Sequence, residues 1–402
     1  MGLPLGFGVE SVPLSRRNLL TDKMRLLRSA SGIAFSIFLM IIQLGFQAAY
    51  IEGTLAVVRR FDADLVIVSA AKYQVSKKSP FSRRLLYAAR GVTGVASAHP
   101  VYGEWTRSTW QNAADGKRYF IQVLAFDPDQ PAFLIPEVNA KLDALRQPDT
   151  VIMDRRSRAN IGEARIGLAT ELASRRLEVV GIFSMGPDFF TDGTLIMSDR
   201  TFEKFFPAGP APSATADAAR NRLSERPNVE FGFIKVTPGQ DIVEVQARLR
   251  AALSSEVSVL TMQELMDKES SFQAIFNPVG PIFSLGVLVG FVVGMMISYQ
   301  ILFNDITDQL PQYATLKAMG YTNGYLVAVV LQQAVFYGIV GFIPALIYSA
   351  ISLKVLAEIA LLQFPLTLGL VAFSAALTVG MCVVSGLIAV RRVISTDPAE
   401  VF

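Results

Sequence analysis

The stretch GFVVGMMISYQILFNDITDQLPQYATLKAMGYTNGYL, residues 290–326, joins the end of one long apolar run to the start of another. Each run is long enough to cross about 30 Å of hydrocarbon as a helix. A plain hairpin between two membrane helices needs only a turn. This insert instead carries a proline, a helical apolar stripe, one lysine and three tyrosines. The stretch therefore predicts a membrane protein whose polar loop has its own structure.

The rest of the chain supports an integral membrane α-helical fold. Hydrophobic residues make up 51% of the 402 residues, and the mean hydropathy is +0.40. Charged residues are 18%, below the roughly 25% of an average soluble domain. We predict one span before and three spans after a large α+β domain. The four runs without any Asp, Glu, Lys or Arg are 29–50, 281–303, 326–350 and 364–390.

Lys and Arg residues in the short flanking segments predict the orientation. The segments 1–28, 304–325 and 391–402 together carry eight of them, whereas the short loop 351–363 carries one. We therefore expect both termini in the cytoplasm, with 1–28 as an amphipathic segment, 304–325 as a loop and 391–402 as a tail. The large domain 51–280 and the loop 351–363 are then expected on the other side, in the periplasm.

The large domain has the pattern of a mixed α and β fold. Short β-rich runs alternate with segments of helical periodicity, and a Pro- and Ala-rich stretch at 207–227 is interpreted as a mobile surface loop. The helices are expected at 198–206, beginning at Ser198 or Asp199, at 241–253 and at 262–273. The expected strands are 64–70, 118–126, 150–154, 176–183, 194–199, 231–236 and 256–260.

The sequence contains no motif that indicates an enzyme active site. The chain has one Cys, Cys382, and one His, His99, so a His/Cys metal site is not expected. No phosphate-binding P-loop motif occurs, and no catalytic or cofactor-binding residues are predicted. The polar residues of the spans are amides and hydroxyls, which disfavours an ion-driven pump. They are expected to hold helices together: Gln43, Gln47, Gln300, Gln332, Gln333, Ser374 and Thr378.

Span 281–303 carries Gly286, Gly290 and Gly294 at four-residue spacing. Such a stripe of small residues lets another helix approach closely. Two readings stay open: packing within one chain, or the interface of a homodimer.

The loop 304–325 predicts a short helix. Pro311 fits a first helical turn, and Gly320 fits the position just after the last turn. Tyr313 and Leu316 fall on one face, followed by Met319 or Gly320. A helix of two turns is marginal in water, so it needs something to pack on. We expect it to dock in a groove of a soluble partner, the alternative being an interfacial helix lying on lipid.

The loop motif LPQYATLKAMGYTNGYL, residues 310–326, resembles the coupling loop of the DevC family of ABC transporter permeases. That family is part of the FtsX-like superfamily, which includes macrolide-exporter permeases. Further stretches resemble it in order along the chain: RRFDADLVIVSA (59–70), VIMDRRSRANIG (151–162), GPDFFTDGTLIMSDRTF (186–202) and the tail VSGLIAVRRVISTDPAEVF (384–402).

The resemblance implies the permease subunit of an exporter in a bacterial inner membrane, working as a homodimer. It implies a separate ABC ATP-binding subunit, which would hold the ATP and magnesium, a periplasmic membrane-fusion protein and an outer-membrane channel. ATP-driven motion would pass to the outer domain by mechanotransmission, moving a lipid, glycolipid or other hydrophobic substrate. The residues expected to contact the ATPase are Pro311, Gln312, Tyr313, Thr315, Leu316, Lys317, Met319, Gly320 and Tyr321, with Asp397 and Pro398 in the tail.

Two other functions are weighed. A non-transporting signal relay, as in the cell-division branch of the superfamily, would use the same motion to control a periplasmic partner. A membrane enzyme is the third, and no catalytic constellation in the sequence supports it. No nucleic-acid partner is expected, because the net charge is only +3.

Overall fold

The computed structural model describes residues 23–207 and 228–395. They form two units: a helical unit within 23–47, 282–355 and 365–395, and a globular unit of Ala48–Pro281 with Leu356–Phe364. The predicted fold class is confirmed, with one long apolar helix before and three after a large α+β domain. Residues 1–22 and, apart from Pro207, the predicted loop 207–227 lie outside the described residues.

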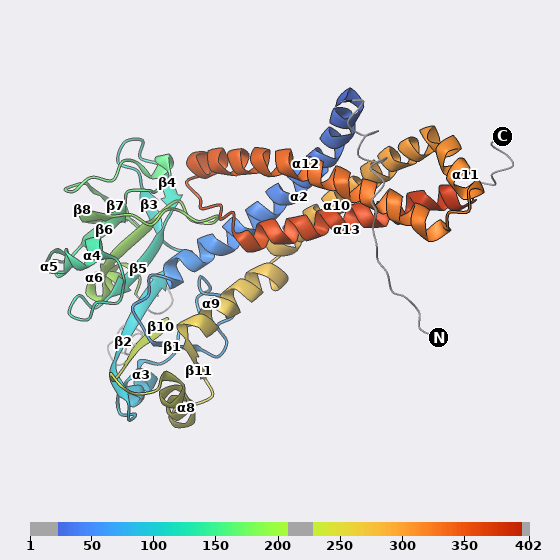
Figure 1. The fold of residues 1–402 in the computed structure, drawn as a ribbon. Helices are drawn as coiled ribbons and strands as arrows, with labels where there is room; N and C mark the ends of the chain where they lie inside the picture. The colour runs from blue at the N-terminus through green and yellow to red at the C-terminus, as the bar shows by residue number, and fades with distance from the viewer. Residues whose placement is uncertain (1–22, 208–227, 396–402) are drawn as a thin grey trace. The chain divides into compact units, whose positions relative to one another are not determined.

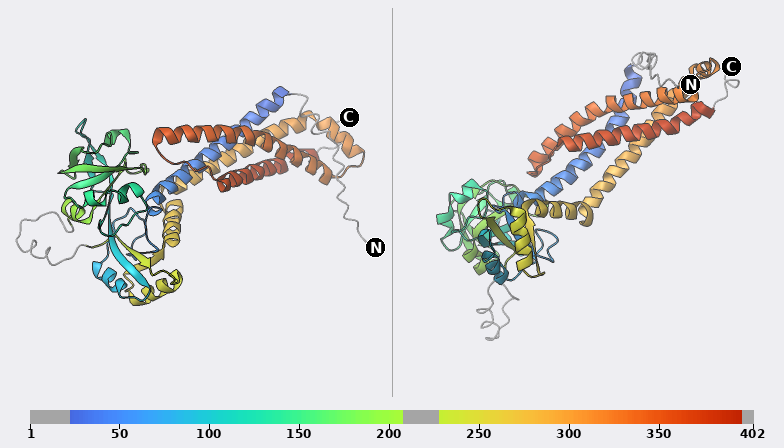
Figure 2. Two further views of the ribbon diagram at one scale, coloured as in Figure 1. Left: turned by 60° about the vertical axis from the view of Figure 1, so that its left-hand side comes forward. Right: turned by 60° about the horizontal axis from the view of Figure 1, so that its bottom comes forward.

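Four long helices carry the apolar runs, and all four are long and apolar enough to cross a membrane. Three of them extend beyond both ends of the predicted run, whereas α13 begins four residues after the start of its run and extends beyond it only at the C-terminal end. They lie beside one another in the helical unit (Figures 1 and 2). Their bounds are α2 Lys23–Val58, α10 Val279–Asp308, α12 Asn323–Ala360 and α13 Leu368–Ser395.

The helical unit is held together by an apolar interior with a few polar links. Ile37 and Met40 of α2, Tyr337 of α12 and Met381 of α13 are fully or almost fully buried in one cluster. Ser385 donates a 2.7 Å hydrogen bond to a backbone carbonyl of α10. Gln47 donates a 3.1 Å hydrogen bond to a serine of α10, and Gln333 also bonds across helices. The expectation that amides link the helices is confirmed for these two glutamines.

The globular unit is built on one 11-stranded mixed sheet (Figure 1). The strand order is β11-β1-β10-β2-β5-β9-β6-β8-β7-β3-β4, with β5–β9 and β6–β8 as parallel pairs. The strands are β1 Leu65–Ser69, β2 Val95–Glu104, β3 Thr109–Gln111, β4 Arg118–Phe120, β5 Gln122–Phe126, β6 Thr150–Asp154, β7 Ala169–Leu172, β8 Arg175–Phe183, β9 Thr194–Ser198, β10 Phe231–Val236 and β11 Val257–Thr261.

Both faces of the central strands are buried. Side chains alternate along each strand, so neighbouring residues enter different cores. In β1, Leu65 and Ile67 belong to one apolar cluster, and Val66 and Val68 belong to the other. Central strands covered on both faces read as continuous apolar runs. This is why the sequence shows them clearly.

Short helices cover the sheet, and their starts follow ordinary capping chemistry. Ser198 accepts from the backbone N–H of Thr201 and caps α6, one of the two caps predicted. Thr261 and Glu264 form a capping box at α9. The helices are α3 Arg83–Arg90, α4 Pro136–Asn139, α5 Leu142–Leu145, the 3₁₀ turn η1 Ala159–Ile161, α6 Asp199–Phe205, α8 Ile242–Ala252, α9 Met262–Ser271 and the π-helical turn η2 Phe272–Phe276.

Three predictions about strands were wrong or incomplete. The single strand expected at 118–126 is two strands that separate at Ile121, because β4 pairs with β3 whereas β5 pairs with β2 and β9. The ten-residue β2 was missed: it contains Pro100, which argues against a central strand, and it opens with small residues. The short strands β3 and β7 were missed because three or four residues give too little periodicity.

Candidate functional site

The predicted loop helix exists as α11, Leu310–Ala318, at one end of the helical unit (Figure 1). Pro311 lies in its first turn, as predicted. Gly320 has a left-handed backbone with φ of 92°, and its N–H bonds to the carbonyl of Lys317 at 3.1 Å. The N–H of Tyr321 bonds to the carbonyl of Leu316 at 3.2 Å. Together these two bonds form a Schellman motif, which stops the helix before α12.

Tyr313 and Leu316 were expected to face a soluble partner, but they face the spans of their own chain. Tyr313 and Ala314 are buried, and Leu316 packs against the apolar cluster of the helical unit. Burial, with the charge of Asp305 as a smaller cause, raises the pKa of Tyr313 to about 12. The apolar stripe therefore holds α11 onto its own chain. The exposed residues expected to contact the ATPase are Pro311, Gln312, Thr315, Met319, Gly320 and Tyr321, and Lys317 is half-buried.

Asp305 is the residue that sequence reasoning misplaced. It was counted in the loop 304–325, but α10 continues to Asp308 and buries Asp305 inside the helical unit. Its Oδ2 accepts hydrogen bonds from Tyr337 Oη at 2.5 Å and from Gln333 Nε2 at 3.0 Å, both on α12. The inference that the spans bury only amides and hydroxyls is therefore wrong for this carboxylate. One signal in the sequence was available. Asp305 follows Ile301 by four residues, so both lie on one face if the helix continues past residue 303.

The glycine stripe of α10 packs within the chain. A Cβ on Gly286 would lie 2.7 Å from the side chain of Gln43, and one on Gly290 would lie 2.8 Å from Met40, both on α2. A Cβ on Gly294 would lie 2.5 Å from the sulfur of Met381 on α13. A homodimer interface at this stripe stays a prediction. Asp397 and Pro398, the predicted tail residues, lie outside the described residues.

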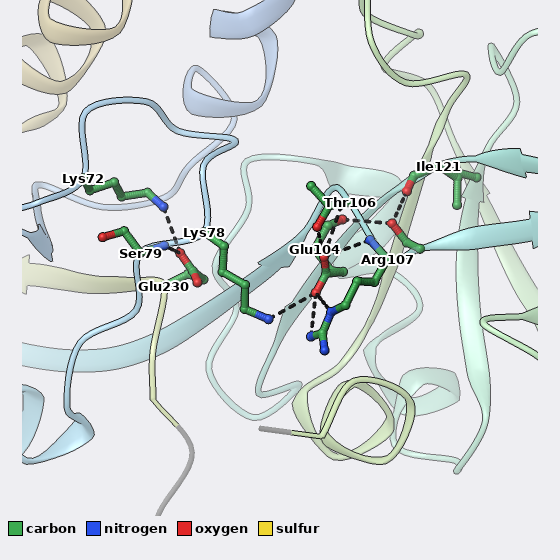
Figure 3. Close-up of polar contacts among 9 residues, drawn as sticks. Lys72, Lys78, Ser79, Glu104, Thr106, Arg107, Ile121 and Glu230 are labelled. Atoms are coloured by element: carbon green, nitrogen blue, oxygen red, sulfur yellow. Dashed lines mark hydrogen bonds and ion pairs between the residues drawn. The ribbon is translucent and has the colours of Figure 1, made fainter. Parts of the chain in front are cut away.

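The globular unit contains a cluster of buried charges that the sequence did not reveal (Figure 3). Glu104 is 1% exposed and bonds to Arg107 at 2.8 Å and to Lys78 at 3.2 Å. Burial alone would raise the pKa of Glu104, but these bonds outweigh it and lower the pKa to about 2. Lys72 and Glu230 form a second pair at 2.8 Å.

The Lys72–Glu230 pair is almost completely buried, with side chains 2% and 4% exposed. Burial lowers the pKa of Lys72, and the neighbouring Glu230 opposes that shift. Lys72 also donates to the carbonyl of Lys77, and Glu230 accepts from the N–H of Ser79. These bonds tie the loop after β1 to the start of β10, and Oε1 of Glu230 has no hydrogen-bond partner among the described residues. Within the described part of the chain, no group of three or more His, Cys, Asp or Glu residues is placed to hold a metal ion.

Two family models match the chain. The model described as "MacB-like periplasmic core domain" matches residues 28–252, and "FtsX-like permease C-terminal" matches residues 263–398. The first covers more than half of the chain, and the two occur in the order of the globular unit and the last three helices. No curated protein matches at the level of sequence.

Solved structures of similar domains are also found. The periplasmic region of MacB from Actinobacillus actinomycetemcomitans is 10% identical with a TM-score of 0.34, over 54% of this chain and 95% of that one. The extracellular domain of the transporter YknZ from Gram-positive bacteria is 10% identical with a TM-score of 0.32, over 50% and 99%. A domain of a permease protein from Porphyromonas gingivalis is 16% identical with a TM-score of 0.31, over 49% and 89%.

Proposed function

This chain belongs to the family of FtsX- and MacB-like ABC transporter permeases, and we propose that α11 is the helix through which a separate cytoplasmic ATPase moves it. The chain is a multi-pass membrane protein with a periplasmic domain. In the proposed orientation both termini and α11 are cytoplasmic, as the distribution of Lys and Arg predicts.

The observation that carries the proposal is the division of α11 into two faces. Tyr313 and Leu316 attach the helix to its own spans, and Gln312, Thr315 and Met319 remain exposed beside them. Met319 is 63% exposed and lies close in sequence to the exposed Tyr321. A soluble partner that covers this face would displace the water from it.

The same geometry supports transmission of force. α11 is joined to α10 across only Gln309, and a Schellman motif fixes its other end. Asp305 links α10 to α12 directly before the loop. A push on the exposed face would therefore move two spans together instead of bending a flexible connection.

We further propose that this subunit works as a homodimer in an exporter with a membrane-fusion protein and an outer-membrane channel. The DevC-like motifs of the loop and the tail support this assembly, with a lipid, glycolipid or other hydrophobic molecule as the substrate class. The signal-relay alternative uses the same motion. It would be favoured if ATP hydrolysis activated a periplasmic enzyme and no lipid left the membrane.

The test is co-purification of the permease with its co-expressed ATPase. Met319→Asp places a charge on the exposed face of α11 and should reduce recovery of the ATPase at least tenfold, with normal membrane insertion. Lys117→Asp, an exposed change in the globular unit, is the matched control and should leave recovery unchanged. Full recovery with Met319→Asp would contradict the docking face.

A further inference from the structure

The globular unit contains a cavity of about 330 Å³. The cavity is lined by the end of α2, the loops after β1 and β2, the start of β5, the loop between β8 and β9, and α9. Its volume is that of about ten water molecules in the liquid. We call it the α2–α9 cavity. It belongs to a different unit from α11, and the inference below does not depend on the docking proposal.

One buried donor in this cavity has no partner. Gln122 is 2% exposed, and its Oε1 accepts a 3.0 Å hydrogen bond from the indole N–H of Trp105. An indole nitrogen can only donate, so the amide oxygen must face it. The Nε2 group then points elsewhere, and it has no hydrogen-bond partner among the described residues. A ligand with an oxygen acceptor would satisfy it.

Three threonine hydroxyls of the cavity offer only lone pairs. Thr54 donates its proton to the carbonyl of Ile51, and Thr106 donates to Glu104. Thr191 donates to Asp188 at 3.0 Å. Carbonyl and carboxylate oxygens cannot donate, which fixes the direction of all three bonds. The three threonine oxygens therefore accept hydrogen bonds from any ligand, and a ligand rich in N–H or O–H groups fits them.

Two carboxylates line the cavity, and the lining contains one basic residue, Lys77. The carboxylate of Asp188 accepts three hydrogen bonds at Oδ1, from the N–H of Phe190 and from the N–H and the hydroxyl of Thr191. Burial raises the pKa of Asp188, which the charge of Arg158 opposes, and it raises the pKa of Glu269, which Lys72 and Lys268 oppose. A cation bound in the cavity would favour the charged form of both carboxylates further. The rings of Trp105 and Phe190 line the same space and can face a cation.

We propose that the α2–α9 cavity binds a primary ammonium group that carries an oxygen on the neighbouring carbon. The ammonium would donate to Asp188 and to the threonine oxygens, and the oxygen would accept from Gln122. The group can come from a free amino alcohol or from the ethanolamine head of a phospholipid. Thr54 lies on α2, one of the four helices able to span a membrane, which keeps the lipid source open to the test below.

The test measures binding of ethanolamine to the full chain in nanodiscs of phosphatidylcholine and phosphatidylglycerol, by calorimetry. Choline is the matched ligand, because it has the same charge and hydroxyl but no N–H group. We expect ethanolamine to bind at least tenfold more tightly than choline. Equal affinities, or no ethanolamine binding up to about 50 mM, would overturn the proposal. Weaker apparent ethanolamine binding in nanodiscs that contain phosphatidylethanolamine would support it and identify the lipid head as the source.

Two variants separate binding from folding. Asp188→Asn keeps the Oδ1 acceptor for Phe190 and Thr191 but replaces Oδ2 with a donor, so it should weaken ethanolamine binding at least tenfold. Thr54→Val removes one acceptor with little change in shape and should weaken it about threefold to tenfold. Asp129→Asn, at an exposed position, is the control and should change nothing. Unchanged affinity in a folded Asp188→Asn protein would overturn the site.

Discussion

Tyr337 donates a 2.5 Å hydrogen bond to Asp305 across 32 residues of sequence, and so joins α12 to α10 at the base of α11. Gln333 bonds to the same carboxylate oxygen at 3.0 Å. The charge of Asp305 is near enough to Tyr313 to contribute to the raised pKa of that phenol. Asp305 is thus the point where two spans and the loop helix meet, and three of the predictions below concern this region or its exposed face.

Replacing Tyr337 with Phe should weaken the link between α10 and α12. A hydrogen bond to a charged group stabilises by about 1.5–3 kcal/mol, so the thermal midpoint of the chain in nanodiscs should fall by several degrees. ATPase activity should then become less dependent on the transported substrate. Tyr348→Phe on the same helix is the control, because Tyr348 is 66% exposed. Equal effects of the two changes would argue against the link.

Gly320→Ala tests the end of α11. Space around Gly320 is open, since nothing lies within 4 Å of an added Cβ, so the cost comes only from its positive φ. We expect a loss of about 1 kcal/mol in stability and a matching loss of ATPase coupling. Gly324→Ala, inside α12, should be neutral or stabilising. If Gly320→Ala proved as harmless as Gly324→Ala, the loop would not need its fixed turn.

Lys72→Met should destabilise the globular unit strongly. It leaves Glu230 buried without its cation, which typically costs 3–5 kcal/mol. Both tryptophans of the chain, Trp105 and Trp110, lie in this unit, so urea unfolding followed by tryptophan fluorescence reports on it. Lys204→Met breaks the largely exposed pair with Asp149 and should cost less than about 1 kcal/mol. A similarly small loss of stability for Lys72→Met would contradict the claim that Lys72 neutralises a buried Glu230.

The pH dependence of the same unit should show the effect of Glu104. Its pKa in the folded protein is about 2, below the ordinary value of 4.5. A depressed carboxyl pKa stabilises the fold above the unfolded value, and this stability is lost as the pH falls from about 4.5 to about 2. Because Lys78 and Arg107 are about half exposed, we expect only about 1–2 kcal/mol. Glu104→Gln should remove this part of the acid sensitivity, and an unchanged acid transition would refute it.

The spans and the loop helix were predictable because their signals are local. Uncharged runs of about 20 residues identify membrane helices, and Pro311 and Gly320 mark the two ends of α11. The sequence did not predict which surface buries Tyr313. An apolar stripe shows that a face is covered, but it does not show whether the chain itself or a partner covers it.

The buried charges were not predictable because their partners are far apart in sequence. Lys72 meets Glu230 across 158 residues, and Asp305 meets Tyr337 only because α10 runs past the apolar run. Strand β2 was hidden by Pro100, whose missing N–H usually excludes a central strand. In each case tertiary packing overrides the preference of the local sequence.

The most direct measurement of the central claim is site-specific photo-crosslinking of the permease with its co-expressed ATPase. A photoreactive amino acid in place of Met319 should crosslink to the ATPase, whereas one in place of Tyr348, equally exposed on α12, should not. Crosslinking from Met319 alone is the result that docking on the exposed face of α11 requires. No crosslink from Met319, or equal crosslinking from Tyr348, would contradict it.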